Sequence, residues 1–130
     1  MRILLAEDDF VTRKFMVGFL SKYGECDVAV DGMEAVDAFM MALEDDDPYD
    51  LVCLDIMMPV MDGYQALMGI RNLEKERGVA KENEAKVIMT TALNEEKNVK
   101  MAFDLGCTVY SGKPIDQERF EQVLKKFGLI

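Results

Sequence analysis

Short apolar runs alternate along this chain with longer segments in which apolar residues recur every three or four positions. The runs at residues 2–6, 51–54 and 87–89 are too short for helices and predict buried β-strands. Residues 26–30 alternate between apolar and polar side chains, which is typical of an edge strand. A last short run at residues 108–111 completes a set of five predicted strands.

The segments that follow the strands have the spacing of helices. Gly24 is expected to end the first helix and Gly106 the fourth, which Asn94 can cap at its start. Asp116 can cap the last helix in the same way. The charged segment 74–85 predicts the end of the third helix and a surface connection. The apolar stripes consist of Val11, Phe15, Phe19 and Tyr23; Met33, Val36, Met40 and Leu43; Leu67, Ile70 and Leu73; Val99, Ala102 and Phe103; and Phe120, Val123, Leu124 and Phe127.

This alternation of strands and helices predicts the fold class. Five strands that alternate with five helices give an α/β fold, in which right-handed crossovers wrap a parallel sheet. The chain has no internal repeat, low-complexity tract or linker. We therefore expect one doubly wound domain over residues 1–130, with no effector domain after the last helix.

Net charge and hydropathy exclude several kinds of partner. The chain has 15 Lys and Arg against 25 Asp and Glu, a net charge of −10, and no basic stripe, so direct binding of nucleic acid is not expected. The acidic run at residues 44–47 is interpreted as a solvated surface, because it lacks the glycine and closing glutamate of a calcium loop. No apolar stretch is long enough for a membrane span, and no signal peptide precedes the first strand, so a cytoplasmic location is expected.

The absence of histidine limits the chemistry further. A Ser-His-Asp or Cys-His nucleophile is impossible, and the chain cannot itself be a phosphohistidine donor. If phosphoryl transfer occurs, the histidine must belong to a partner. Cys26, Cys53 and Cys107 are widely spaced with no CxxC pair, and we interpret them as structural residues.

Polar residues that could bind a ligand or take part in a reaction follow four of the predicted strands. Because the carboxyl ends of parallel strands share one edge of a sheet, these side chains are expected to meet there. Any one of them alone is more often a cap or turn residue, but their joint placement favours a functional site. They are Glu7, Asp8 and Asp9 after the first strand, Asp55 after the third, Thr91 after the fourth and Lys113 after the fifth.

These residue types point to a metal-assisted phosphoryl transfer. Converging carboxylates repel one another unless a cation lies among them, and oxygen ligands favour a hard ion such as Mg²⁺. With the ion in place, Asp55 can act as a nucleophile toward a phosphoryl group. Lys113 would then pair with the phosphoryl oxygens, and the Thr91 hydroxyl would donate a hydrogen bond to them.

Four segments resemble the receiver domain of two-component response regulators, at residues 3–9, 50–63, 87–92 and 110–114. The stretch Asp-Ile-Met-Met-Pro-Val-Met-Asp-Gly, which begins at Asp55, is the most specific of them. The resemblance covers essentially the whole chain in the right order. It implies a flavodoxin-like fold with strand order 2-1-3-4-5.

The resemblance also implies roles for the acidic residues. Asp55 is similar to the phospho-acceptor aspartate, with Asp8 as a direct metal ligand and Glu7 acting through a bound water. The backbone carbonyl of Met57 matches a further metal ligand. The implied ion is Mg²⁺, with Mn²⁺ as a possible substitute. Asp9 occupies a variable position and is left out of the site.

A conformational switch is implied as well. Thr91 matches the switch hydroxyl, Lys113 the phosphate-binding lysine, and Tyr110 an aromatic residue that changes rotamer when Thr91 moves. The bond between Lys113 and Pro114 is commonly cis in the family. The implied partners are a sensor histidine kinase or a histidine phosphotransfer protein, and a downstream effector protein that binds the face formed by the fourth helix, fifth strand and fifth helix. The chain would be a monomer or a phosphorylation-dependent homodimer, and not an enzyme acting on other molecules.

Three alternatives have different sequence requirements. A phosphatase of the haloacid dehalogenase type would place a second aspartate two residues after Asp55, where this chain has Met57. A flavin-binding domain would need a hydroxyl- or glycine-rich loop in place of the acids at residues 7–9. The third alternative is a receiver-shaped interaction module that is never phosphorylated, although every chemical position is filled.

Overall fold

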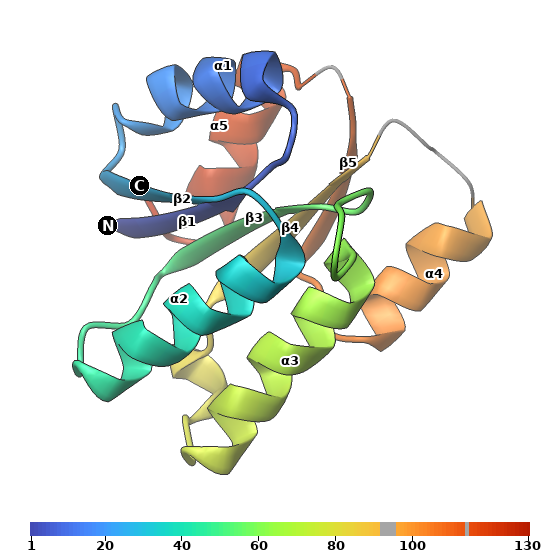
Figure 1. The fold of residues 1–130 in the computed structure, drawn as a ribbon. Helices are drawn as coiled ribbons and strands as arrows, with labels where there is room; N and C mark the ends of the chain where they lie inside the picture. Colours follow the sequence, from blue (N-terminus) through green and yellow to red (C-terminus); the bar gives the residue numbers. More distant parts are fainter. Residues whose placement is uncertain (92–95, 114) are drawn as a thin grey trace.

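The computed structural model describes residues 1–91, 96–113 and 115–130. The predicted cap at Asn94 and the predicted cis bond at Pro114 lie outside these residues. None of the helices formed by the described residues has the length and apolar character that a membrane span requires. The elements, shown in Figure 1, are β1 (Arg2–Ala6), α1 (Phe10–Leu20), β2 (Glu25–Ala29), α2 (Gly32–Glu44), β3 (Leu51–Asp55), α3 (Gly63–Glu76), the short 3₁₀ helix η1 (Lys81–Asn83), β4 (Lys86–Thr91), α4 (Glu96–Asp104), β5 (Val109–Gly112) and α5 (Gln117–Lys126).

The strands form one parallel sheet in the order β2-β1-β3-β4-β5, which confirms the predicted flavodoxin-like topology. Helices α1 and α5 cover one face of the sheet, and α2, α3 and α4 lie on the other (Figure 1). From β1 the chain adds β2 on one side and then β3, β4 and β5 on the other, so the strand order reverses between β1 and β3. In sheets of this kind, the crevice at the carboxyl ends of those two strands is where ligands bind.

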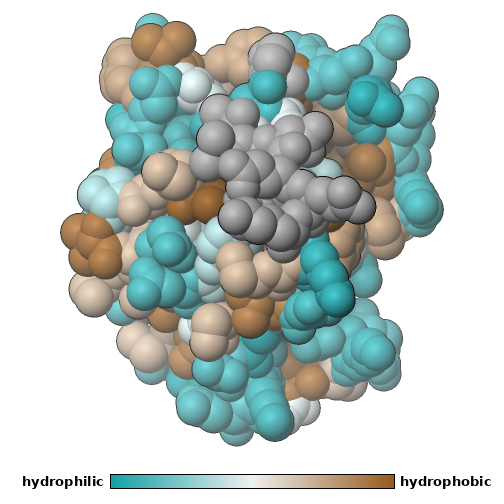
Figure 2. All heavy atoms as spheres, turned by 90° about the vertical axis from the view of Figure 1, so that its right-hand side faces the viewer, coloured by the Kyte–Doolittle hydropathy of each residue, from teal (hydrophilic) through white to brown (hydrophobic). Residues whose placement is uncertain are grey.

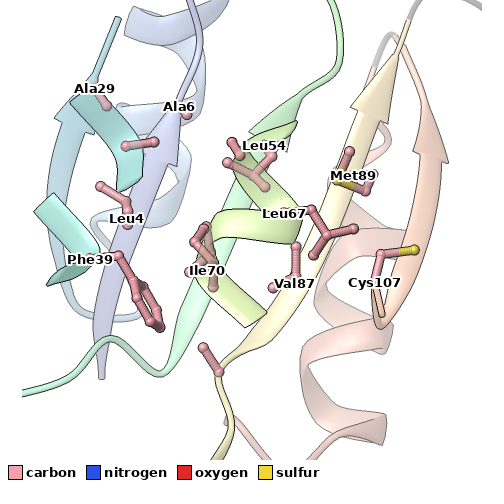
Figure 3. Close-up of a cluster of buried hydrophobic side chains, with 14 of the residues drawn as sticks. Leu4, Ala6, Ala29, Phe39, Leu54, Leu67, Ile70, Val87, Met89 and Cys107 are labelled. Carbon is pink, nitrogen blue, oxygen red and sulfur yellow. The ribbon is translucent and has the colours of Figure 1, made fainter. Parts of the chain in front are cut away.

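Alternate residues of each strand supply the two cores of the molecule. Leu4 of β1 points toward the α2 and α3 side, where it packs in one cluster with Phe39, Leu67 and Ile70 (Figure 3). Its neighbour Ile3 belongs to the second cluster, under α1 and α5. This alternation follows from the two-residue period of a strand. All five residues of β3 are buried, as the continuous apolar run predicted.

The predicted apolar stripe of α1 is only partly buried. Met16, Phe19 and Leu20 are buried, whereas Val11 is 73% exposed and Phe15 is 47% exposed. Residues spaced four apart advance by about 40° beyond a full turn at each step, so a strict four-residue stripe winds around the helix. Only its later members reach the core, and the first turns of α1 present apolar side chains to solvent.

Gly24 does not end α1, contrary to the sequence prediction. The helix ends at Leu20, and Ser21 caps it through backbone N–H bonds to the Phe19 and Val17 carbonyls. A Cβ atom at Gly24 would lie 1.9 Å from the Met1 carbonyl oxygen. The glycine is therefore required for the close approach of the backbone to the start of β1.

The charged segment 74–85 is mostly exposed, but its first residue, in the last turn of α3, is buried. Glu74 is only 2% exposed and forms an ion pair of 2.6 Å with Arg71. Its other carboxylate oxygen accepts a hydrogen bond of 2.7 Å from the Ala85 backbone N–H. Arg71 also donates to the carbonyls of Ala85, at 2.9 Å, and Gly106, at 3.0 Å. This buried pair joins α3 to the start of β4 and to the turn after α4.

Candidate functional site

The polar residues singled out in the sequence gather at the carboxyl edge of the sheet. Glu7 and Asp8 directly follow β1, Asp55 is the last residue of β3, and Thr91 is the last residue of β4. Lys113 directly follows β5, and its backbone N–H donates a 2.8 Å hydrogen bond to the Thr91 carbonyl. The strand ends therefore bring together groups that are more than 100 residues apart in the chain.

Three carboxylates form the centre of the site. One oxygen each from Glu7, Asp8 and Asp55 lies within 4.8 Å of the others. Glu7 and Asp55 are buried, and Asp8 is exposed at the mouth of the site. An all-oxygen set of this size, open to solvent on one side, suits Mg²⁺, because this ion keeps several waters while it binds a few carboxylates. The donor set thus fits the metal that the sequence implied.

Lys113 contacts two of these carboxylates. Its Nζ lies 2.5 Å from an oxygen of Glu7 and 3.4 Å from an oxygen of Asp55. Burial alone would lower the pKa of Lys113, but the hydrogen bond to Glu7 and the charge of Asp55 raise it. The ammonium group is therefore held in its charged form beside the Asp55 carboxylate.

The site carries more negative than positive charge. Burial, followed by the hydrogen bond and charge of Glu7, raises the pKa of Asp55 to about 7, although Lys113 acts in the opposite direction. One ammonium group against three carboxylates leaves an excess of two negative charges when all are ionised. A divalent cation would balance this excess. Its positive charge would favour the ionised form of Asp55 and so lower the pKa of this carboxyl group.

Asp9 is a helix cap and not a member of the site. Its carboxylate accepts hydrogen bonds of 2.9 Å from the Thr12 backbone N–H and 2.6 Å from the Thr12 hydroxyl. These bonds lower the pKa of Asp9. The capped helix places Arg13 over the acidic loop, where its guanidinium donates to the carbonyls of Glu7, at 3.0 Å, and Asp8, at 3.3 Å. Sequence reasoning missed Arg13, since no motif distinguishes it from a solvated helical residue.

The loop between β3 and α3 is tightly folded beside Asp55. Val60 has a positive φ of 69°, and the next N–H, from Met61, donates a 2.7 Å hydrogen bond to the Pro59 carbonyl. This is a γ-turn, a conformation that a β-branched residue adopts only under strain. Strain of this kind is concentrated at functional sites. The Met57 side chain is 62% exposed, and the proposed metal-binding role of its carbonyl remains a prediction.

The predicted switch residues lie on β4, which ends with Thr91, and on the edge strand β5, which contains Tyr110. Thr91 is buried, and Tyr110 is half-buried against the core cluster of the α2 and α3 side. Tyr64, in the first turn of α3, packs against the same cluster. Sequence reasoning missed Tyr64, because its position after Gly63 carried no chemical signal. The predicted movement of Thr91 and Tyr110 remains a prediction.

Exposed apolar side chains of α1 border the site. Phe10, Val11 and Phe15 project from the first half of the helix into solvent. An open groove of about 530 Å³ runs between this helix and the segment after β5, and it is lined by Val11, Thr12, Phe15, Lys113 and Ile115. A partner that reached Asp55 from this side would meet an apolar surface that ends at Lys113.

Comparison with known proteins identifies what this arrangement is similar to. The family model described as "Response regulator receiver domain" matches residues 3–125. The chemotaxis protein CheY of Treponema pallidum is 35% identical over 130 residues, which cover 95% of this chain and 83% of CheY. The probable histidine kinase 2 of Oryza sativa subsp. indica is 32% identical over 134 residues, which cover 95% of this chain but only 12% of the kinase.

A solved structure shows the same fold. CheY in the CheX-CheY-BeF3-Mg²⁺ complex from Borrelia burgdorferi has a TM-score of 0.82 and 32% sequence identity. The match covers 98% of this chain and 89% of that CheY chain. The similarity thus extends over nearly the full length of both chains.

Proposed function

The chain belongs to the response regulator receiver domain family, and we propose on this basis that Asp55 accepts a phosphoryl group from a phosphohistidine on a partner protein. Receiver domains act in two-component phosphorelays. The observation that carries the proposal is the convergence of Glu7, Asp8 and Lys113 on Asp55 at the carboxyl edge of the sheet. We propose that the receiver domain spans residues 1–130.

The proposed transfer forms one bond and breaks one. An oxygen of Asp55 bonds to phosphorus while the P–N bond of the donor breaks, and its electron pair stays on the imidazole nitrogen of the partner. Glu7, Asp8, Asp55 and the carbonyl of Met57 would hold Mg²⁺. The ion would neutralise charge on the transferred oxygens. Lys113, which now contacts Asp55 at 3.4 Å, would pair with the same oxygens.

The product would carry more negative charge than the free carboxylate. An acyl phosphate on Asp55 adds strong acceptor oxygens beside the end of β4, where the hydroxyl of Thr91 can donate to them. We propose that the inward movement of Thr91 lets Tyr110 change position and alters the face of α4, β5 and α5. Figure 2 views the molecule from the side on which α4 and β5 lie. Met101 and Phe103 of α4 are exposed and would offer apolar contacts to an effector protein or to a second copy of the chain.

In this proposal the protein modifies only its own aspartate. The phosphatase alternative would require an acid two residues after Asp55, and Met57 has no group that could protonate a leaving alcohol. We propose that the domain acts in the cytoplasm, where a histidine kinase or histidine phosphotransfer protein would supply the phosphoryl group. The acidic surface does not favour contact with nucleic acid.

The apolar surface of α1 is the proposed contact for the donor protein. Phe15→Ser is expected to slow phosphoryl transfer from a phosphohistidine protein about tenfold or more, because it removes one apolar anchor beside the site. Transfer from acetyl phosphate should stay within twofold of the wild type, since this small donor needs no docking surface. Met41→Ser, which replaces an exposed apolar side chain on α2, serves as the control. Equal loss with both donors would assign Phe15 to folding and not to docking.

The proposed function is tested by incubating the protein with acetyl phosphate and Mg²⁺ and measuring its intact mass. We expect a phosphoryl adduct that requires the metal and is absent from Asp55→Asn. A chelator should prevent its formation in the wild type. A protein that is folded and binds Mg²⁺ but forms no adduct would instead be an interaction module that is never phosphorylated.

A further inference from the structure

Arg13 of α1 reaches back over the acidic loop that follows β1. Its backbone N–H donates a 2.9 Å hydrogen bond to the carbonyl of Asp9, the residue that caps the helix. Side chains of a helix point toward its N-terminus, so a residue in the first turns can cover the chain that precedes the helix. One guanidinium nitrogen of Arg13 accordingly lies 3.0 Å from the Glu7 carbonyl oxygen and 3.3 Å from that of Asp8. The side chain therefore joins α1 to the backbone of two residues of the carboxylate cluster.

The ring of Phe10 supports this position of Arg13. The guanidinium carbon lies 5.6 Å from the centroid of the ring, within the range of a cation–π contact. Phe10 is the first residue of α1 and is 65% exposed, so burial in the core does not account for its apolar side chain. The ring and the two hydrogen bonds together fix the guanidinium over the loop.

The loop under Arg13 has to hold charges that repel one another. Carboxylate oxygens of Glu7, Asp8 and Asp55 lie within 4.8 Å of one another. Lys113 contacts the carboxylates of Glu7 and Asp55, whereas Asp8 is exposed at the mouth of the site. A ligand set that is held in place before the ion arrives loses less conformational freedom on binding, and its affinity is higher for this reason. A group that fixes the backbone of Glu7 and Asp8 would therefore strengthen metal binding without touching the ion.

We infer that Arg13 is a positioning residue, which holds the backbone of Glu7 and Asp8 so that their carboxylates converge on the proposed metal site. This inference rests on the proposed function, because it assigns Arg13 a part in the same site. The two possible effects of the guanidinium on metal binding have opposite signs. Its positive charge, acting alone, would repel Mg²⁺, so removal of the charge would tighten binding. Removal of a group that orients the ligands instead weakens metal binding, typically by about 10- to 100-fold.

The test is the dissociation constant of Mg²⁺, measured by NMR titration of the backbone amide signals at constant ionic strength. We expect Arg13→Met to raise this constant about tenfold, the lower end of that range, because the mouth of the site is open to water. Arg13→Lys should stay within about threefold of the wild type, because an ammonium group has three donors and can replace the single nitrogen that contacts both carbonyls. Lys14→Met is the matched control. It removes an exposed cation from the next position of α1 and should leave the constant unchanged or slightly lower.

Amide hydrogen exchange in the metal-free protein gives a second measurement. The Asp9 N–H donates a 3.3 Å hydrogen bond to a carboxylate oxygen of Glu7, so its exchange reports whether the loop keeps its arrangement. This exchange should be faster in Arg13→Met than in the wild type, Arg13→Lys or Lys14→Met.

An Arg13→Met dissociation constant equal to or below that of the wild type would show that the guanidinium acts only as a charge, and the inference would be wrong. A wild-type protein that binds no Mg²⁺ would overturn both the inference and the proposed metal site. All of these measurements use unphosphorylated protein. They therefore decide the role of Arg13 even if the intact mass shows that Asp55 is never phosphorylated.

Discussion

Replacement of Lys113 with methionine is expected to lower the rate of Asp55 phosphorylation by acetyl phosphate by roughly two to three orders of magnitude. Among the described residues, Lys113 is the cation that contacts Asp55, and its Nζ lies 3.4 Å from the carboxylate. Removal of one fixed hydrogen-bond donor, which stabilises the negative charge that develops on oxygen in the transition state, typically lowers a reaction rate by a factor of this size. The rate is measured from intact mass over time, at saturating Mg²⁺.

Two controls separate this effect from loss of the fold. Lys125→Met removes an exposed lysine that pairs with Glu121 on α5, and its rate should match the wild type. Lys113→Met should still bind Mg²⁺ in calorimetry, because Glu7, Asp8 and Asp55 remain. A Lys113→Met rate within threefold of the wild type would show that the lysine has no part in the transfer.

Arg71→Leu is expected to lower the free energy of unfolding by about 3 kcal/mol. The substitution leaves the buried carboxylate of Glu74 without its ion-pair partner, and loss of one member of such a pair typically costs about 3–5 kcal/mol. The carbonyls of Ala85 and Gly106 also lose a donor. We choose the lower end of the range, because the Arg71 side chain is 18% exposed and water can reach the site. Urea denaturation followed by circular dichroism measures the change.

Arg77→Leu is the corresponding control on the same helix end. Arg77 pairs with Glu44 at 3.4 Å, but both side chains are well exposed, so its loss should cost less than about 1 kcal/mol. Similar midpoints for the two variants would mean that the Arg71–Glu74 pair contributes no more than a surface pair. The Arg71 variant should still form the phosphoryl adduct under conditions in which it is folded, because the pair contacts the start of β4, at the opposite end of the sheet from Asp55.

The sequence was sufficient to predict the fold and the composition of the acidic cluster. Both follow from local patterns, because short apolar runs mark the strands and parallel strands carry their carboxyl ends to one edge. Asp55 could be located for this reason alone. The resemblance added the expectation that Asp55 accepts the phosphoryl group and that Glu7 and Asp8 help to hold the metal.

Features that depend on packing could not be predicted in this way. The stripe that included Val11 and Phe15 was helical in spacing, but only the packed structure shows which side of α1 faces the sheet. Glu74 lies in a charged segment, and its burial depends on Arg71 and on the backbone of β4, which no local pattern reveals. Tyr64 and Tyr110 lie 46 residues apart in the chain, and only the packed fold brings them against the same core cluster.

The direct test of the central claim is to identify the residue that carries the phosphoryl group. Borohydride reduces an aspartyl phosphate to homoserine, and peptide mass spectrometry after digestion then reads the position. After incubation with acetyl phosphate and Mg²⁺, we predict homoserine at position 55 and unmodified acids at positions 7, 8 and 9. Reduction at one of those three positions, or at none, would contradict the assignment of Asp55 as the acceptor.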